Sequence, residues 1–241
     1  MKNKIGKTSE IMWLLGNIFV ALGVAVCSKA DLGVSMIAAP AFVIHEAISK
    51  VFDFLTVGVV EYIVQGIILV IMCLVVRKFN WKYLLAFAVA VIYGYTLNFF
   101  LWVLGGVSFD ALWLRWLMLI VGDVCTAFGV ACFFKTYLPL QVFELFVAEV
   151  AARFNFNINK TKSVFDLSLL ALSVTLSLVL FLDVAEFDWV SVYRTSFHNI
   201  GLGTIVTTLI NSPIIAFMGK MLDRFTNPTP AFPKLYKVLK K

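Results

Sequence analysis

The chain has 241 residues, of which 61% are hydrophobic and 14% are charged, whereas roughly 25% of an ordinary soluble domain is charged. A mean hydropathy of +0.95 is more than one water-soluble core can bury, because a compact domain leaves a large surface in water. The composition therefore predicts an integral membrane protein, and it excludes disordered, fibrous, secreted disulfide-rich and nucleic-acid-binding proteins. The formal net charge of +6 does not indicate nucleic acid, because the basic residues flank apolar stretches.

In chain order, six apolar stretches come close to the length of about 20 residues that a membrane-spanning helix needs. Two further apolar segments, 33–44 and 138–148, are shorter. Runs of that length are more often re-entrant, interfacial or buried, and a full span stays open as the alternative. The sequence thus predicts an all-α, polytopic membrane protein in a single domain, 1–241, with two short broken helices. The six predicted spans are 11–27, 56–76, 83–104, 111–134, 163–182 and 200–219.

The basic residues indicate the orientation of the spans, because Lys and Arg accumulate in cytoplasmic loops. With both termini cytoplasmic, the two terminal tails and the loops 77–82 and 135–162 hold most of the 20 basic residues. The second of these loops contributes Arg153, Lys160 and Lys162. The opposite loops then hold the acidic Asp110, Asp183, Glu186 and Asp188, with Lys29, Lys50 and Arg194 as basic exceptions.

An internal repeat emerges when the chain is compared with itself at an offset of 106 residues. Asn17 then pairs with Asp123, and Glu61 pairs with Asp166 after one deleted residue. Each repeat, 10–104 and 111–222, has three spans and a short segment after its first span, and 223–241 is a basic tail. Because three is odd, the repeats have opposite orientation, which is typical of alternating-access transporters. A duplication that only fixes a stable scaffold is the alternative. The identical pairs begin at positions 12, 16, 21, 23, 24, 25, 29 and 32.

Several short motifs, in order along 10–222, give the chain a family resemblance. They are Lys29-Ala30-Asp31-Leu32-Gly33-Val34-Ser35, a glycine (Gly58) early in the next span, Tyr93-Gly94-Tyr95, Lys162-Ser163-Val164-Phe165-Asp166 and Gly201-Leu202-Gly203-Thr204. With these motifs the chain resembles the YczE/YitT-like family of bacterial membrane proteins. The resemblance implies a six-span protein of the bacterial inner membrane and supplies no substrate. Where related sequences often have an acid after the Gly-Tyr turn, this chain has Asn98, which keeps a polar group without the charge.

Three acidic residues in the predicted spans are candidates for ion or proton coupling, because ionisable groups inside a membrane are costly and often functional. These are Glu61, with Gln65 one turn further on the same face, Asp123 near the middle of its span, and Asp166 near the start of its span. The alternative is a structural role, as salt-bridge partners of a nearby Lys or Arg or as hydrogen-bonding contacts between helices.

A second group of residues predicts substrate binding at the breaks in the two repeats. Lys29 and Lys135 end the first span of each repeat, where a cation and the free amides of a helix start could bind an anion together. Snorkelling of both lysines to the membrane surface is the alternative. His45, next to Glu46, could titrate near neutral pH or cap a helix. The substrate-binding candidates are Lys29, Ser35, His45, Asn98, Lys135 and Gln141.

Together these features predict a small secondary transporter for a small polar or anionic solute, coupled to protons or another cation. A non-transporting membrane scaffold or regulatory partner is the alternative. No motif indicates an enzyme, a cofactor or a metal, and the four cysteines lie in apolar runs as small hydrophobic residues. The expected partners are the solute or ion and the lipid bilayer, with anionic lipid along the basic tail, and a homo-oligomer stays open.

Overall fold

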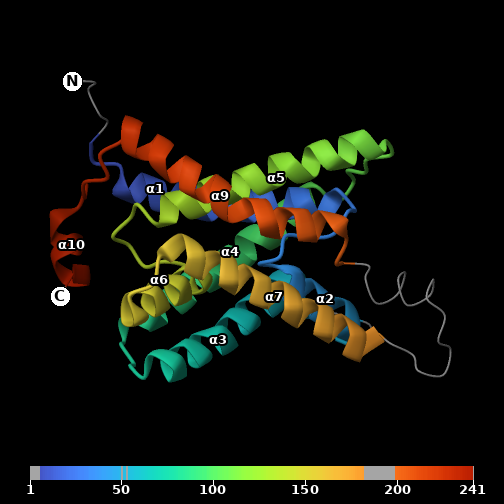
Figure 1. Ribbon diagram of the computed structural model, residues 1–241, viewed down its shortest axis with the longest axis horizontal. Helices are drawn as coiled ribbons and strands as arrows, with labels where there is room; N and C mark the ends of the chain where they lie inside the picture. The colour runs from blue at the N-terminus through green and yellow to red at the C-terminus, as the bar shows by residue number, and fades with distance from the viewer. Residues whose placement is uncertain (1–5, 50, 53, 182–198, 241) are drawn as a thin grey trace.

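The computed structural model describes residues 6–49, 51–52, 54–181 and 199–240, and the regular elements in them are α-helices. Six helices are long and apolar enough to cross a membrane, which confirms a multi-pass membrane protein (Figure 1). The acids Asp183, Glu186 and Asp188 of the predicted loop between the last two spans lie outside the described residues. The six spans are α1 (Ser9–Lys29), α3 (Val57–Val76), α4 (Lys82–Val103), α5 (Leu112–Phe133), α7 (Ile158–Phe181) and α9 (Leu202–Phe225).

The helix α7 begins at Ile158, five residues before the predicted span. Asn157 explains the early start, because its side-chain oxygen accepts a hydrogen bond from the backbone N–H of Asn159 at 2.9 Å and so caps the first turn. Lys162, assigned above to a loop, therefore lies inside a helix, and it is only 2% exposed. The loop assignment of Lys162 was wrong.

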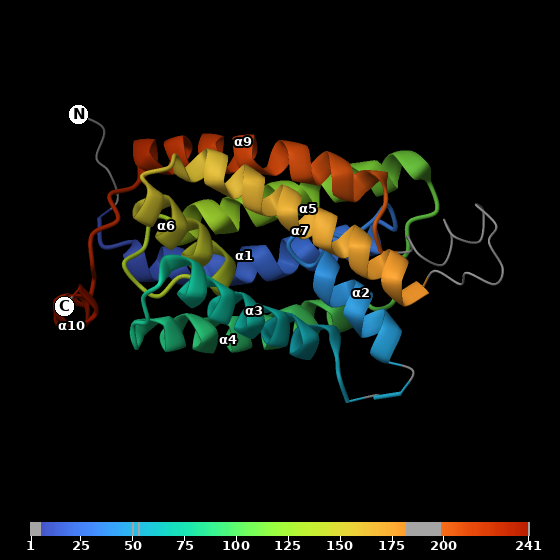
Figure 2. The same cartoon turned by 60° about the horizontal axis from the view of Figure 1, so that its bottom comes forward.

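Both short apolar segments form helices too short to span a membrane, α2 (Ala39–Ile48) and α6 (Val142–Phe154). Each follows a non-helical stretch that enters the interior, so that Met36 and Ile37 before α2 are buried in one core cluster with Val142 and Phe143 of α6. From there α2 lies toward one end of the bundle and α6 toward the end that holds both chain termini (Figures 1 and 2), which is called the terminal end below.

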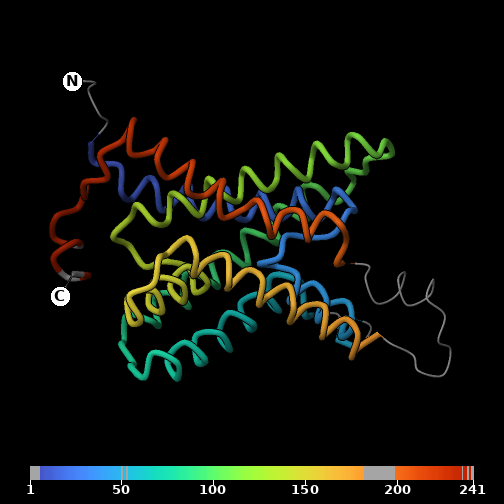
Figure 3. The backbone as a smooth tube through the Cα atoms, viewed as in Figure 1, coloured from blue at the N-terminus to red at the C-terminus, as the bar shows by residue number. Residues whose placement is uncertain are grey.

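In the described part of the chain, eight helices form the bundle, and they fall into two groups. The first is a row in which α4 packs on α1, α1 on α5 and α5 on α9. The second is a ring in which α2 packs on α3, α3 on α6, α6 on α7 and α7 on α2. The row and the ring join where α3 meets α4 and where α7 meets α9 (Figure 3). The polar residues described below lie between these two groups.

Four glycines allow α1 and α5 to pack backbone against backbone. Gly16 of α1 lies against Gly129 of α5, and Gly23 lies against Gly122, where a Cβ added to Gly23 would be 2.5 Å from the Gly122 carbonyl oxygen. Small residues at helix contacts are typical of membrane interiors, since close backbones gain packing energy where no hydrophobic effect operates. This contact forms the centre of the row.

The stretch before α2 is held by the start of α9. Gly33 has a φ of +104°, a conformation that glycine adopts without strain. Around it, the Val34 amide donates to the Asn199 carbonyl at 3.0 Å and the Gly203 amide donates to the Leu32 carbonyl at 2.9 Å. These bonds satisfy backbone groups that lipid could not. Two motifs of the family resemblance are thus in direct contact.

The carboxyl tail folds back over the terminal end. The Glu10 carboxylate accepts hydrogen bonds from the Tyr137 hydroxyl at 2.6 Å and from the backbone amides of Ala231 and Phe232, each at 3.0 Å. The tail then forms the basic helix α10 (Pro233–Lys240), and the Lys82 ammonium donates to the Leu239 carbonyl at 2.7 Å. The start of α1 and the carboxyl tail are therefore held together by these hydrogen bonds.

Candidate functional site

A cluster of buried polar side chains lies between the row and the ring. The ring contributes acids from α3, α6 and α7, and the row contributes polar residues from α4, α5 and α9. Buried polar groups cost free energy unless they are paired, so a cluster of this size inside a membrane protein is a candidate site. Hydrogen bonds or electrostatic interactions link Glu61, Gln65, Tyr93, Asp123, Glu144, Lys162, Asp166 and Ser212 into this cluster. Asn17, Gln141 and Asn211 are further buried polar residues of the bundle.

On α3, Glu61 and Gln65 are one helical turn apart, and the Gln65 amide donates to a Glu61 oxygen at 3.5 Å. Glu144 of α6 and Tyr93 of α4 both lie within electrostatic range of Glu61. The second Glu61 oxygen, the Gln65 carbonyl oxygen, the Tyr93 hydroxyl and one Glu144 oxygen have no hydrogen-bond partner among the described residues. Four polar atoms from three helices are thus buried and unpaired at this point.

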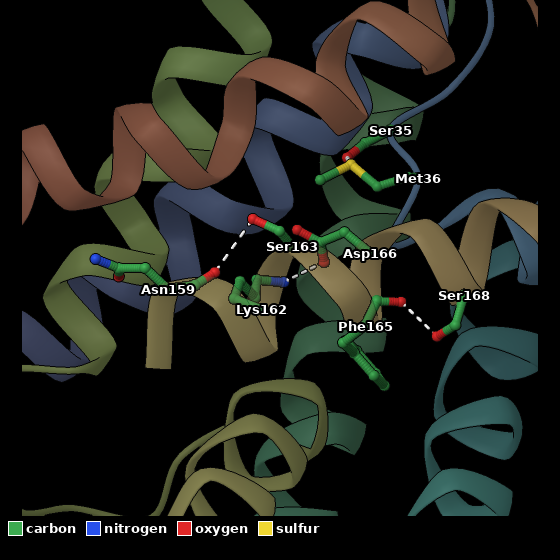
Figure 4. Close-up of polar contacts among 8 residues, drawn as sticks. All are labelled: Ser35, Met36, Asn159, Lys162, Ser163, Phe165, Asp166 and Ser168. Atoms are coloured by element: carbon green, nitrogen blue, oxygen red, sulfur yellow. Dashed lines mark hydrogen bonds and ion pairs between the residues drawn. The ribbon is translucent and has the colours of Figure 1, made fainter. Parts of the chain in front are cut away.

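On α7, the Lys162 ammonium and the Asp166 carboxylate form a buried ion pair at 2.7 Å (Figure 4). Glu144 lies within electrostatic range of both residues, so the ion pair is adjacent to the acids around α3. In the described part of the chain, the second Asp166 oxygen has no hydrogen-bond partner. A buried ion pair seldom stabilises a fold more than apolar residues would, and conformational or functional roles are its better-attested uses.

The row helices α5 and α9 complete the cluster. Asp123 lies within electrostatic range of Asp166, and neither Asp123 oxygen has a hydrogen-bond partner among the residues that the structure describes. On α9, Ser212 lies beside Asp166. Pro213 follows it inside the helix and has no N–H to donate to the preceding turn. The side-chain amide of Asn211 is also buried, with no hydrogen-bond partner in the described part of the chain. The polar groups of α9 therefore lie where Pro213 interrupts the helical hydrogen bonds.

The charges of the cluster do not balance. Four carboxylates, on Glu61, Asp123, Glu144 and Asp166, face one ammonium, on Lys162, which gives a formal charge of −3 when all are ionised. A low-dielectric interior does not hold such a charge, and protons or bound cations must neutralise it. Within the described part of the chain, no three His, Cys, Asp or Glu side chains are arranged to hold a metal ion.

The structure brings together the three residues predicted for coupling, Glu61, Asp123 and Asp166, in this cluster. Two predicted substrate-binding residues lie where the short helices begin. Gln141 is the N-cap residue of α6 with its amide nitrogen unpaired, and Ser35 is buried before α2 with its hydroxyl 3.6 Å from the Met36 sulfur.

The other four predicted substrate-binding residues lie away from the cluster. Lys29 ends α1, while Lys135 pairs with Asp223 at 2.7 Å near the terminal end, so the two lysines lie at opposite ends of the bundle. The His45 ring nitrogen Nδ1 lies 2.7 Å from the Leu55 carbonyl oxygen. Asn98 joins α4 to α3 through hydrogen bonds to Thr56 at 2.8 Å and to the Gly58 amide at 2.9 Å.

Sequence reasoning assigned Lys162 to a loop and left Glu144 undecided between polar surface and cavity lining, and it did not single out Tyr93, Asn211 or Ser212 as site residues. The spacing of Lys162 and Asp166 is the (i, i+4) spacing of a helical ion pair, and that signal was available once α7 was extended. Glu144 carried no comparable signal, because an acid in the first turn of a short segment is equally typical of a helix end in water.

The chain belongs to a family described as a family of unknown function (DUF6198), whose model matches residues 7–220. The match includes all the residues of the cluster. Neither the curated proteins nor the solved structures gave a match.

Proposed function

Since membership of this family names no activity, we propose from the geometry that the protein is a small secondary transporter for a polar solute, coupled to protons or another cation. One observation carries the proposal: four buried carboxylates and one lysine meet between the row and the ring, with several polar atoms unpaired. Ionisable residues in the interior of membrane bundles typically mark ion and substrate pathways.

An inverted repeat, with 10–104 related to 111–222, supports alternating access. If the two repeats are exchanged, α1 replaces α5, α2 replaces α6, α3 replaces α7 and α4 replaces α9. The contacts of the row are then the same in reverse order, and the α3–α6 contact becomes the α7–α2 contact. The glycine contacts Gly16–Gly129 and Gly23–Gly122 exchange with each other in the same way. A broken helix in each repeat, with a polar site at the interface between the repeats, is typical of such transporters.

The row and the ring are the natural moving parts of this mechanism. The polar cluster lies in the seam between them, and its predicted coupling residues are each at most 1% exposed. We take this closed arrangement as the occluded state. Protons or cations neutralise the acids in that state, and their release to one side leaves the buried charges unpaired, which favours a state that hydrates them.

The charge of the cluster favours a neutral or positively charged polar solute over an anion. An anion would need at least three of the four acids to be neutral, although the starts of α2 and α6 present helix amides that favour negative charge. The positions of Lys29 and Lys135 at opposite ends speak against their joint binding of one anion, and favour snorkelling at the membrane surface.

The orientation and the membrane are part of the proposal. The terminal end has the loop residues Arg77 and Lys78 and the basic helix α10, which the positive-inside rule assigns to the cytoplasm. We further propose the bacterial inner membrane and a relation to YczE/YitT-like proteins, on the motif contact between the Gly33 and Gly201 segments. Anionic lipid is the proposed partner of the basic tail.

A scaffold or regulatory partner is the second candidate, and the closed Lys162–Asp166 pair is the observation that favours it. Transport is tested with purified protein in liposomes that contain a pH-sensitive dye, under an imposed pH gradient, against a panel of small polar solutes. We expect solute-dependent proton flux that Glu61→Gln and Asp123→Asn abolish and that Glu149→Gln, on the same helix as Glu144, retains. The scaffold would be favoured if the protein binds a member of the panel but shows neither solute flux nor proton movement.

A further inference from the structure

The asymmetry between the two repeats points to one particular half of the cluster. We infer that the α3–α6 contact is the site of one exchangeable monovalent cation, a proton or an alkali-metal ion, held by Glu61 and Glu144, and that Lys162 is the fixed equivalent of that cation in the other half. The inference rests on the proposed function in one respect, since it names the half of the site that carries the coupling ion.

The two half-sites have the same framework and different charges. In the second repeat, Asp166 on α7 has its own cation one turn earlier, Lys162 at 2.7 Å, and α7 packs on α2. In the first repeat, Glu61 is the counterpart of Asp166, and α3 packs on α6. The counterpart of Lys162 is Val57, which carries no charge. Glu61 therefore lacks the built-in cation that Asp166 has.

The residue that α6 contributes adds a second acid to the α3–α6 half-site and so increases its lack of positive charge. Glu144 enters the α3–α6 half-site from the first turn of α6, whereas its counterpart at the offset of the repeat is Ala38, just before α2. One half-site thus has two acids and no lysine of its own, whereas the other has two acids, Asp166 and Asp123, and one lysine. Lys162 lies within electrostatic range of Glu144 but is already bound to Asp166, so one ammonium serves both carboxylates.

Unpaired oxygen atoms independently indicate a ligand at the α3–α6 half-site. They are one oxygen each of Glu61 and Glu144, the carbonyl oxygen of Gln65 and the hydroxyl of Tyr93, on residues at most 1% exposed. Carboxylate, carbonyl and hydroxyl oxygens are suited to small hard cations, and two neighbouring carboxylates can also share one proton.

The groups that face this half-site come from four helices. Glu61 and Gln65 lie on α3, Tyr93 on α4 and Glu144 on α6, and the Lys162–Asp166 pair on α7 faces Glu144. Asp123 on α5 faces Asp166 and belongs to the second half-site. Removal of charge from Glu61 or Glu144 should therefore remove the demand for an external cation.

The test is thermal unfolding of the purified full chain in detergent, at pH 6 and pH 8.5, in sodium, potassium or N-methylglucamine chloride. For wild-type protein at pH 8.5 in N-methylglucamine we expect the lowest Tm. A cation at 100 times its dissociation constant should raise Tm by about 5–10 °C. A rise on acidification alone assigns the proton, and a rise with sodium or potassium at pH 8.5 assigns the metal ion. No rise in any condition overturns the inference.

Variants locate the effect. Glu61→Gln and Glu144→Gln should each remove the rise, and the matched variant Glu149→Gln should keep it. Val57→Lys places an ammonium one turn before Glu61, at the spacing of Lys162 and Asp166, and should raise Tm at pH 8.5 in N-methylglucamine while it removes the response to cations. Val57→Met, which adds length without charge, should respond as wild type does. Responses to cations that persist in Glu61→Gln or in Val57→Lys overturn the assignment to this half-site.

These measurements distinguish failure of the proposed cation site from failure of the proposed transport function. A cation-dependent Tm that follows the variants as stated, in protein that shows no solute flux, keeps the cation site and rejects the transporter. Solute-coupled flux in protein whose Tm ignores Glu61 and Glu144 keeps the transporter and places its coupling ion elsewhere.

Discussion

At the scale of single residues, the balance of charge decides what the interior can hold. Lys162 is buried because Asp166 neutralises it at 2.7 Å, one helical turn away. Because Glu144 also lies within range of Lys162, the ammonium is shared by more than one acid. A change in any one of these three residues should therefore alter the charge on the others.

Removal of the charge from Asp166 should leave Lys162 buried without its ion partner. Loss of one partner of a buried pair typically costs about 3–5 kcal/mol, and Glu144 should reduce that cost here. We therefore expect Asp166→Asn to lower Tm clearly, and the double variant Lys162→Met with Asp166→Leu, which removes both charges, to recover most of it. Thermal unfolding in detergent measures both. Equal losses in the single and the double variant would show that packing, and not charge, sets the stability at this point.

At the scale of helices, the length of the apolar runs was enough to predict the spans, but the polar residues in the sequence were not enough to predict the whole site. The six long helices follow from about 20 apolar residues each, and the breaks before the short helices follow from Gly33 and Pro139. The start of α7 was missed, because a first turn of polar residues looks like a loop until Asn157 is recognised as its cap. Lys162 was misplaced for the same reason.

The contact between α1 and α5 depends on glycine. A Cβ on Gly23 would lie 2.3 Å from the Thr126 hydroxyl oxygen and 2.5 Å from the Gly122 carbonyl oxygen, so the two helices would have to separate. We expect Gly23→Ala to lower Tm strongly. Gly219→Ala on α9 is the matched control, since its Cβ would meet no atom within 4 Å and alanine is the better helix former. A Gly23→Ala protein as stable as wild type would mean that the two helices do not approach this closely.

The tail should detach when Glu10 is lost. Burial and the hydrogen bond to Glu10 raise the pKa of Tyr137 to about 12, so its hydroxyl remains a donor at neutral pH. Glu10→Ala removes the acceptor for Tyr137 and for the Ala231 and Phe232 amides. We expect faster trypsin cleavage in α10, measured by mass spectrometry. Glu46→Ala, at the other end of the bundle, is the control, and equal cleavage in both variants would show that Glu10 does not hold the tail.

At the scale of the whole molecule, the distribution of charge predicts the orientation in the membrane. Lys78 lies in the loop between α3 and α4 at the terminal end, and Ser108 lies in the exposed loop between α4 and α5. In protein whose native cysteines are replaced by alanine, an impermeant thiol reagent outside the cell should label Ser108→Cys and spare Lys78→Cys. The reverse pattern would reject cytoplasmic termini, while the helices and their packing would stand.

Alternating access requires the row to move against the ring, and this movement should change which end of the bundle is open. Ser35, before α2, and Gln141, at the cap of α6, are each 1% exposed, and they occupy equivalent positions in the two proposed repeats. In alternating access, a cysteine at position 35 is reached from the end opposite the termini in one state, and a cysteine at position 141 from the terminal end in the other. A change of pH or of cation shifts the population between the two states, because the ion binds them unequally. In right-side-out and inside-out vesicles we therefore expect the labelling rates of Ser35→Cys and Gln141→Cys to change in opposite directions when the cation is varied. Rates that rise together would indicate a channel, and slow labelling of both positions under every condition would indicate a closed scaffold.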